Sequence, residues 1–347
     1  MRILITGNLG YVGPVVMGQL RAAWPDSELV GFDTGYFAHC LTGVEAIPER
    51  ILSAQHFGDL REFPTRLLEG VDAVVNLAAI SNDPMGNQFE SVTLDINHRA
   101  GIDLAQAAKR AGVRRFIFAS SCSVYGFAAD GARNESSPLD PLTAYARSKV
   151  STERDLEPLA DRDFQITCLR FATACGWSDR LRLDLVLNDF VASAIAARKI
   201  TILSDGTPWR PLIHVQDMAR AIEWAVVRDE ASGHYLVLNA GSDDWNYQVR
   251  DLARGVAKVF PGVEVSINTS AAPDRRSYRV DFARFRAAAP NHQPQVGLGE
   301  AIFGLKEGLE RMRFADAEFR QSSLIRLQAL RSHLTGGRLN SDLRWTS

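Results

Sequence analysis

A short apolar run and three evenly spaced glycines at the start of the chain most constrain its fold. Residues 2–6 lead into Gly7-x-x-Gly10-x-x-Gly13, after which the sequence continues in a helical pattern. Gly7 permits a tight turn, Gly10 lets backbone amides approach phosphate oxygens, and Gly13 lets the helix pack closely on the strand. Although the first two glycines are one residue farther apart than in the usual dinucleotide fingerprint, the pattern predicts a strand, a turn and a helix whose N-terminus holds a pyrophosphate.

Asp33 supports the dinucleotide interpretation. It closes the next expected strand, residues 28–33, at the distance where an acid accepts hydrogen bonds from an adenosine ribose. A carboxylate there would repel a ribose 2′-phosphate, and the following Thr34 and Gly35 offer no arginine to receive one. The sequence therefore favours NAD over NADP as cofactor.

Strand and helix signals alternate through the first half of the chain. Apolar strands separated by helical stretches such as 97–111 and 144–159 predict a doubly wound parallel sheet of the Rossmann type, an α/β fold with ligands beyond the carboxyl ends of the strands. The expected strands are 2–6, 28–33, 72–77, 114–120 and 165–172, with two more sheet or edge strands at 211–216 and 234–239.

The pattern loosens after about residue 176, which predicts a smaller α/β substrate-binding lobe. We expect a Rossmann domain at 1–175 to which 211–241 returns, a lobe from 176–210 and 242–315, and a helical tail at 316–347. In that tail the leucines at 324, 327, 330 and 334 combine with Arg320, Arg326 and Arg331 in the pattern of a basic amphipathic helix. Docking on its own protein or on a second subunit is favoured over a membrane surface.

Composition excludes several classes of function. The net charge of −2 over 347 residues gives no basic surface for nucleic acid. No apolar run is long enough to cross a bilayer and the N-terminus already reads as a strand, so we expect a cytoplasmic protein that does not bind membranes. The four cysteines form no C-x-x-C pair and the histidines no H-E-x-x-H pattern, so we expect free thiols and no metal.

A tyrosine and a lysine form the candidate catalytic pair. Tyr145 and Lys149 are four residues apart, which places them on one face of a helix. Tyrosine, with a reference pKa of about 10, is a poor base at neutral pH. A neighbouring ammonium and a positively charged nicotinamide both favour the phenolate. The pair could then exchange a proton with a sugar hydroxyl while hydride moves, beside the hydroxyls of Ser120, Ser121 and Ser123 at the end of a strand.

The chain resembles the extended short-chain dehydrogenases/reductases of the nucleotide-sugar epimerase/dehydratase family. The resemblance rests on several motifs that occur in the family's order along nearly the whole sequence. They are the glycine turn, Asp33, Gly58-Asp59-Leu60, Asn76-Leu77-Ala78-Ala79, Asn97, Ser121-Cys122-Ser123-Val124-Tyr125-Gly126, Tyr145-x-x-x-Lys149, and the run from Gly206 through Arg210 and His214 to Asp217.

The resemblance implies NAD as cofactor, a nucleoside-diphosphate sugar as substrate, a homodimer, and a role for each matched position. The implied catalytic residues are Tyr145, Lys149, Ser121 and Ser123. The implied cofactor-binding residues are Gly7, Leu9, Gly10, Tyr11, Val12, Gly13, Asp33, Asp59, Leu60, Leu77, Ala78, Ala79, Asn97, Ser120, Tyr145 and Lys149. The implied substrate-binding residues are Ser81, Asn82, Tyr125, Arg182, Asn188, Arg210 and Arg275, the last from a cluster with Arg276 and Arg279.

Two substitutions in the serine motif bear on the reaction. The family's 4,6-dehydratases carry an acid and a base, Asp and Glu, where this chain has Cys122 and Ser123. Neither is a convincing acid or base at neutral pH, so the resemblance favours epimerisation, at C4 through a transient ketone, with NAD kept bound. A reductase, dehydrogenase or dehydratase on a nucleotide sugar is the first alternative, and a non-catalytic NAD-binding regulator the second. For Cys122 itself, a buried and inert thiol is favoured over a reactive one.

Overall fold

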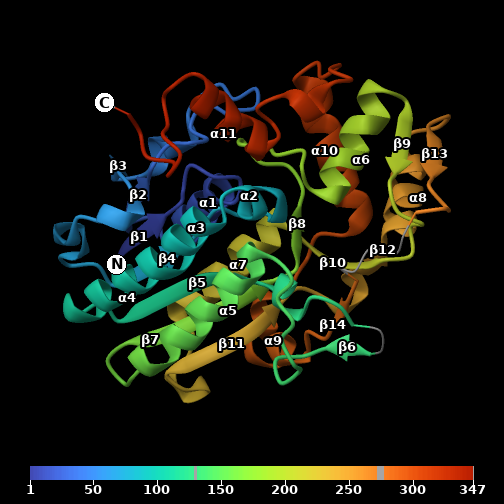
Figure 1. Ribbon diagram of the computed structural model, residues 1–347. Helices are drawn as coiled ribbons and strands as arrows, with labels where there is room; N and C mark the ends of the chain where they lie inside the picture. Colours follow the sequence, from blue (N-terminus) through green and yellow to red (C-terminus); the bar gives the residue numbers. More distant parts are fainter. Residues whose placement is uncertain (129–130, 272–276, 347) are drawn as a thin grey trace.

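A seven-stranded parallel sheet is the centre of the fold, in a computed structural model that describes residues 1–128, 131–271 and 277–346 (Figure 1). The strand order is β11-β7-β5-β4-β1-β2-β3, and every neighbouring pair is parallel. The expected α/β fold with a parallel sheet is confirmed. The strands are β1 (Arg2–Thr6), β2 (Glu28–Asp33), β3 (Ala54–Phe57), β4 (Ala73–Asn76), β5 (Arg115–Ser121), β7 (Gln165–Phe171) and β11 (Tyr235–Ala240).

Helices cover both faces of this sheet. Alternate residues of β1 point to opposite faces, and Ile3 and Ile5 pack in the same buried cluster as α1 (Gly13–Ala23) and α7 (Val215–Val227). Leu4, between them, belongs to a second cluster with residues of α4 (Ala100–Arg110) and with Leu156, the last residue of α5 (Ala144–Leu156). The expected helix at 97–111 begins instead with a π-helical turn, Asp95–Arg99, that runs into α4.

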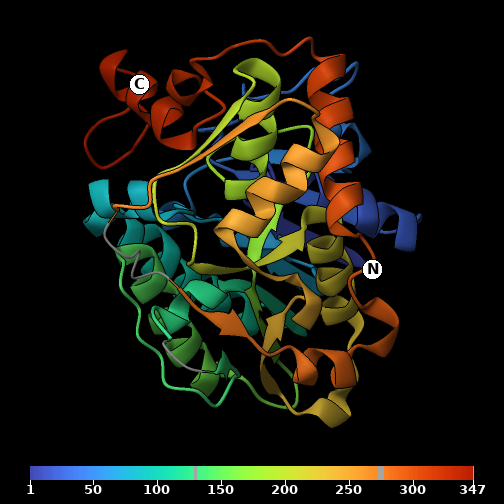
Figure 2. The ribbon, with the colours of Figure 1, turned by 90° about the vertical axis from the view of Figure 1, so that its right-hand side faces the viewer.

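A second group of helices stands beside the sheet (Figures 1 and 2). Helices α6 (Val186–Ala196), α8 (Val249–Val259) and α10 (Leu298–Arg311) share one apolar core that includes Val191, Leu252 and Leu305. The strand expected at 211–216 forms as β10 (Trp209–His214), but it pairs with β8 (Thr173–Cys175) and β12 (Asn246–Gln248) rather than with the main sheet. The remaining elements are β9 (Lys199–Ile202), β13 (Glu264–Ile267), β6 (Ala132–Arg133), β14 (Arg279–Val280), α2 (Asp83–Gln88), α3 (Glu90–Leu94) and α9 (Ala283–Ala288).

The C-terminal tail is helical only in part. Helix α11 spans Arg326–Thr335 and ends before the consecutive glycines 336 and 337, of which Gly337 has a φ of +68°. Leu330 of α11 packs in one buried cluster with Met85 of α2 and Val92 of α3. The tail therefore docks on its own chain, which was one of the two expected arrangements. Arg326 is buried rather than solvated, because it donates hydrogen bonds to the carbonyls of Arg180 and Leu181. Within the described ranges, no helix combines the length and apolarity needed to cross a membrane.

Candidate active site

A cavity of about 1140 Å³ lies at the carboxyl ends of the sheet strands. Its walls include Gly7, Asp33, Leu77 and Ser121, which lie at or just after the ends of β1, β2, β4 and β5. Arg210, from the segment beside the sheet, lines the same cavity. The cavity therefore occupies the place where open parallel sheets bind their ligands.

The glycine turn forms one wall of the cavity, where it closely approaches the segment that follows β4. Gly7 has a φ of +75°, and a Cβ built there would lie 2.5 Å from the backbone nitrogen of Ala78. A Cβ on Gly13 would lie 1.9 Å from the carbonyl oxygen of Asn8, inside the turn itself. Gly10 and Val12 face the cavity just before α1 begins. The first amides of that helix have no intrahelical partner, which suits them to phosphate oxygens.

Replacing Gly7 by alanine is expected to abolish tight NAD binding and to lower the free energy of unfolding by about 2–4 kcal/mol. The methyl group would meet backbone atoms that cannot rotate away, in a conformation that already strains an L-residue. Calorimetry with NAD and urea denaturation measure the two effects. Gly18→Ala, on the helix that follows the turn, is the matched control, because a Cβ there would meet no neighbouring segment within 4 Å. Unchanged NAD affinity in Gly7→Ala would contradict the assignment of this turn.

Tyr11 joins the glycine turn to the neighbouring lobe. Its hydroxyl donates to the carbonyl of Gly176 at 2.6 Å and accepts a hydrogen bond from Asn188 at 3.3 Å. Its own carbonyl accepts from the Ser178 hydroxyl at 2.6 Å. Burial raises the pKa of Tyr11 far above its ordinary value, so the phenol stays protonated. Tyr11, a residue of the expected cofactor turn, is thus part of the apolar core shared by α6, α8 and α10, which we call the second lobe.

Asp33 ties the end of β2 to the glycine turn. Its carboxylate accepts one hydrogen bond from the Leu9 amide at 3.0 Å and another from the Gly35 amide at 2.7 Å. Burial raises the pKa of Asp33, and these two backbone hydrogen bonds oppose that rise. Leu9 does not line the cavity itself, and its amide acts through Asp33. The geometry places the acid where the sequence motif expects a ribose.

Asp59 and Leu60 form the neighbouring part of the cavity wall. Asp59 precedes the 3₁₀ turn Leu60–Glu62 and caps it by accepting from the Arg61 amide at 2.9 Å. The Arg61 guanidinium also pairs with the same carboxylate at 2.5 Å. Burial alone would raise the pKa of Asp59, but the hydrogen bonds from Arg61 outweigh it and the pKa is lowered. The role of Arg61 was not predicted from the sequence.

Ser121, Tyr145 and Lys149, the predicted Ser–Tyr–Lys set, line the same cavity. Thr143 caps α5 through its hydroxyl, which accepts from the Ala146 amide at 3.2 Å, so the helix begins just before Tyr145. Tyr145 is hydrogen-bonded to Ser121. The Lys149 ammonium donates to the carbonyl of Ala119 at 2.7 Å and lies 5.5 Å from the centre of the Tyr145 ring. The three side chains therefore come from α5 and the end of β5.

Burial moves the pKa values of this set in opposite directions. It raises the pKa of Tyr145 to about 12, partly offset by the hydrogen bond to Ser121. It lowers the pKa of Lys149 to about 8, while the charge of Glu153 opposes that fall. The sequence argument expected Lys149 to favour the phenolate, but burial dominates within the protein alone. Reaching the phenolate near neutral pH therefore needs a further positive charge beside Tyr145.

Cys122 and Ser123 begin a 3₁₀ turn, Cys122–Tyr125. The Ser121 hydroxyl caps this turn by accepting a hydrogen bond from the Ser123 amide. Cys122 is buried, its thiol donates to the carbonyl of Arg170 at 3.1 Å, and burial raises its pKa well above the usual range. The burial expected from the sequence is confirmed, and a buried thiol with a raised pKa is a poor nucleophile. The Ser123 hydroxyl is buried at the cavity wall and finds no hydrogen-bond partner in the described part of the chain.

Three predicted substrate residues form a polar cluster near Tyr145. Arg182 pairs with Asp184 at 2.7 Å and donates to the Ser81 hydroxyl at 3.0 Å. Asn82 donates to the other oxygen of Asp184 at 2.7 Å and also caps α2. All of these side chains line the cavity. Asp184 was not singled out from the sequence, although it lies only two residues from Arg182.

Most of the predicted site residues line this one cavity. Those that do are Gly7, Gly10, Tyr11, Val12, Asp33, Asp59, Leu60, Leu77, Ala78, Ala79, Ser81, Asn82, Ser120, Ser121, Ser123, Tyr145, Lys149, Arg182 and Arg210. Gly13 and Asn97 instead support the walls, Asn97 by hydrogen bonds to both backbone groups of Ile80. Arg275 lies outside the described residues. Arg326 and Tyr278 line the cavity without having been predicted.

Two predicted substrate contacts are corrected by the structure. Tyr125 is fully buried away from the cavity, where its hydroxyl donates to Asn239 at 2.6 Å and accepts from Arg170 at 3.0 Å. Asn188 is also fully buried, and it bonds the Gly176 amide at 3.0 Å and the Arg182 carbonyl at 3.0 Å. Both side chains point into the protein, so they hold the segments that carry the site.

The residues present fit NAD. The glycine turn gives a cradle that any Cβ at Gly7 would fill, and Asp33 and the Ser–Tyr–Lys set lie along one cavity. The unpartnered hydroxyl of Ser123 leaves a polar atom available to a ligand. Within the described ranges, no group of three or more His, Cys, Asp or Glu side chains could hold a metal. Fold and site together define an NAD-binding enzyme of the short-chain dehydrogenase/reductase class.

The comparison with sequence families agrees with this class. The chain belongs to the NAD dependent epimerase/dehydratase family, whose sequence model matches residues 3–241.

Individual relatives differ in their reactions. The chain is 27% identical over 315 residues to a UDP-glucose 4-epimerase of Mycolicibacterium smegmatis, covering 87% of this chain and 96% of that protein. It is also 27% identical over 312 residues to a dTDP-glucose 4,6-dehydratase of Streptomyces griseus, covering 88% and 91%. The solved structure of MoeE5 with UDP-glucuronic acid and NAD is similar at 27% identity and a TM-score of 0.76, covering 90% of this chain and 99% of MoeE5. The names of all three relatives include a nucleotide sugar and MoeE5 was solved with NAD, whereas the two named reactions differ.

Proposed function

We propose that this protein epimerises a nucleoside-diphosphate sugar at C4 through a transient 4-keto sugar. The observation that carries the proposal is the Ser121–Tyr145–Lys149 set, complete and gathered at one cavity, with Cys122 and Ser123 in place of an acid and a base. Elimination of water needs that acid and base, whereas epimerisation needs only reversible oxidation at one carbon. Bound NAD supplies the reversible hydride acceptor.

The chain's own residues would handle the proton and hold the sugar. Tyr145 would take the proton of the C4 hydroxyl and return it to the same oxygen after the ring has turned. Ser121 would hydrogen-bond that oxygen, and Lys149 would orient the tyrosine and support its phenolate. Arg210 and Arg182 line the cavity and their guanidinium groups suit the oxygens of a diphosphate.

Relatives support a uridine nucleotide as one candidate substrate. MoeE5 structures contain UDP-glucuronic acid and UDP-glucose at 27% and 28% identity to this chain. The mycobacterial relative acts on UDP-glucose by its name. UDP-sugars are therefore the first substrates to test, with a dTDP-sugar for comparison because of the dehydratase relative.

The test is incubation with UDP-glucose, UDP-glucuronic acid and dTDP-glucose without added cofactor, followed by chromatography and mass spectrometry. We expect a product of unchanged mass and altered retention from one of them. Cys122→Ala is the matched control, because the buried thiol does not line the cavity and turnover should persist.

Other products would contradict the proposal in distinct ways. A product lighter by one water would identify a dehydratase. Turnover that consumes added NAD or NADH in equal amounts would identify a one-way oxidoreductase. Tight NAD binding with no product from any nucleotide sugar would identify a regulator.

A further inference from the structure

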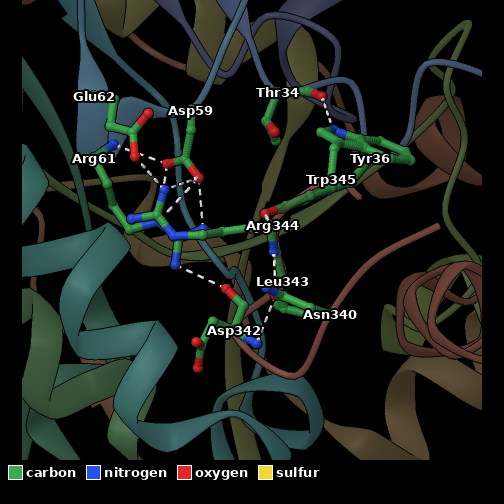
Figure 3. Close-up of polar contacts among 10 residues, drawn as sticks. All are labelled: Thr34, Tyr36, Asp59, Arg61, Glu62, Asn340, Asp342, Leu343, Arg344 and Trp345. Carbon is green, nitrogen blue, oxygen red and sulfur yellow. Dashed lines mark hydrogen bonds and ion pairs between the residues drawn. The ribbon is translucent and has the colours of Figure 1, made fainter. Parts of the chain in front are cut away.

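The last residues of the chain pack against the segments that contain Thr34, Tyr36 and Asp59 (Figure 3). These segments form the end of the cavity that also holds Asp33, where we expect the adenosine of NAD. Two loops form that end, residues 34–37 after β2 and residues 58–62 after β3, and both contribute to the cavity wall. We refer to them as the adenosine loops. Because β3 is the edge strand of the sheet, no further strand supports the loop that follows it. Residues 338–346 pack against this unsupported side, and none of them lines the cavity.

The first adenosine loop is held by Leu343 and Trp345 of residues 338–346 and by His333 near the end of α11. The indole nitrogen of Trp345 donates to the carbonyl of Thr34 at 2.6 Å. The Tyr36 hydroxyl donates to the carbonyl of Leu343, and His333 Nε2 donates to the carbonyl of Tyr36 at 2.9 Å. The contacts of Trp345 and His333 reach main-chain carbonyls of the loop and fix its path, whereas the contact with Leu343 holds the side chain of Tyr36.

The second adenosine loop is held through charges. Arg344 pairs with Glu62 at 2.5 Å and lies 3.9 Å from the carboxylate of Asp59. Arg61, which holds Asp59, donates in turn to the carbonyl of Asp342 at 2.8 Å. The side chains of Arg61 and Asp59 are only 10% and 18% exposed, whereas those of Arg344 and Glu62 are 40% and 69% exposed, so the network is shielded from water only at its Asp59 end. The orientation of the Asp59 carboxylate therefore depends on Arg61, which the tail itself fixes.

The tail has its own anchor. Leu343 has a φ of +53°, which is unusual for a leucine, and its side chain is fully buried with Tyr36, Ile80 and Leu339. The side chain of Asn340 accepts hydrogen bonds from the amides of Asp342 and Arg344 and so closes the loop on itself. A backbone held in this conformation by packing presents Arg344 and Trp345 in fixed directions.

We infer that residues 338–346 position the adenosine half of NAD, with Arg344 and Trp345 as positioning residues that act through the two adenosine loops. The tail bridges two loops that would otherwise move independently at the sheet edge. Because the loops are already ordered before NAD binds, binding loses less conformational entropy. It lies outside residues 3–241, which the family's sequence model matches. The inference rests on the NAD site and not on the proposed C4 reaction.

The test compares full-length point variants by calorimetry with NAD and with ADP-ribose, which keeps the adenosine, the diphosphate and the second ribose and lacks only the nicotinamide. We expect Arg344→Ala combined with Trp345→Ala to weaken both ligands together by about tenfold or more, and to speed NAD release. Trp345→Phe keeps an aromatic side chain beside Tyr36 and His333 and removes the indole N–H that donates to Thr34. It should weaken ADP-ribose by a few fold, and it remains informative if the double variant unfolds.

Two controls separate positioning from general destabilisation. Arg331→Ala removes a tail contact to Gln88 and should leave ADP-ribose binding unchanged. Val191→Ala opens a cavity in the apolar core shared by α6, α8 and α10, which includes none of residues 338–346, and should lower Tm without weakening ADP-ribose. Unchanged ADP-ribose affinity in a folded double variant, or a loss no larger than that of Val191→Ala, would overturn the inference. Absence of epimerase activity alone would leave this result untouched.

Discussion

Replacing Tyr145 by phenylalanine is expected to lower kcat about a thousandfold while NAD remains bound. The variant removes one hydroxyl, the group that would exchange the proton with the sugar, and general acid–base catalysis typically contributes about 10²–10⁴. The cofactor's expected contacts at the glycine turn and Asp33 stay in place. Steady-state turnover on the substrate found above, with the NAD content of the purified variant, measures both effects.

The control for this variant is Tyr247→Phe. Tyr247 lies on β12, does not line the cavity, and removal of its hydroxyl should leave kcat unchanged. If Tyr145→Phe turned over at the rate of Tyr247→Phe, the proposed mechanism would be wrong. If it lost NAD as well as activity, Tyr145 would serve mainly to hold the cofactor.

Replacing Glu153 by glutamine is expected to lower the free energy of unfolding by about 3–5 kcal/mol. Glu153 and Arg170 form an ion pair at 2.7 Å with side chains only 5% and 6% exposed. Glutamine keeps the shape but leaves the guanidinium charge buried without a counter-charge. The same carboxylate accepts from the Ser120 hydroxyl at 2.5 Å, beside the cavity. Urea denaturation of the unliganded protein measures the loss.

An exposed ion pair supplies the comparison. Glu90→Gln breaks the ion pair between Glu90 and Arg147, whose side chains are 56% and 43% exposed. It should change the free energy of unfolding by less than about 1 kcal/mol. Replacing Glu153 and Arg170 together by apolar residues should recover much of the lost stability, because no unpaired charge remains. Equal stability of Glu153→Gln and the wild type would show that Arg170 finds other compensation.

The effect should also reach the candidate catalytic lysine. The charge of Glu153 opposes the burial that lowers the pKa of Lys149 to about 8. Without that charge the pKa of Lys149 should fall further, so the lysine would lose its proton at a lower pH. A pH–rate profile of Glu153→Gln should therefore move toward acid on any limb that requires protonated Lys149.

Local sequence patterns predicted the strands and helices whose own residues show an apolar pattern. Strand β1, for example, carries the apolar run of residues 3–5, because a central strand is buried on both faces. The edge strand β3 was missed, since Ala-Gln-His-Phe has no apolar face and Phe57 is 67% exposed. Its strand conformation comes from pairing with β2, which the segment's own sequence does not encode.

Motif spacing predicted which residues approach the cavity better than it predicted their directions. Residues at the ends of β1, β2, β4 and β5 converge because parallel strands end at one edge of the sheet. Tyr125, at a motif position, and Asn188, an expected substrate contact, both face inward, because a 3₁₀ turn and a helix start set their directions. Arg61 and the tail residues were missed for another reason, since their contacts join positions about 280 residues apart in the chain.

The hydrogen bond from Tyr11 to Gly176 has a consequence for engineering new specificities. Transplanting the substrate-recognising part of a relative onto this cofactor-binding half is usually planned as a cut between contiguous segments. Here one side chain from the first dozen residues belongs structurally to the part being exchanged. A chimera cut near residue 176 would leave that phenol facing a foreign carbonyl. Grafts that carry the matching residue at position 11 should fold, and those that omit it should not.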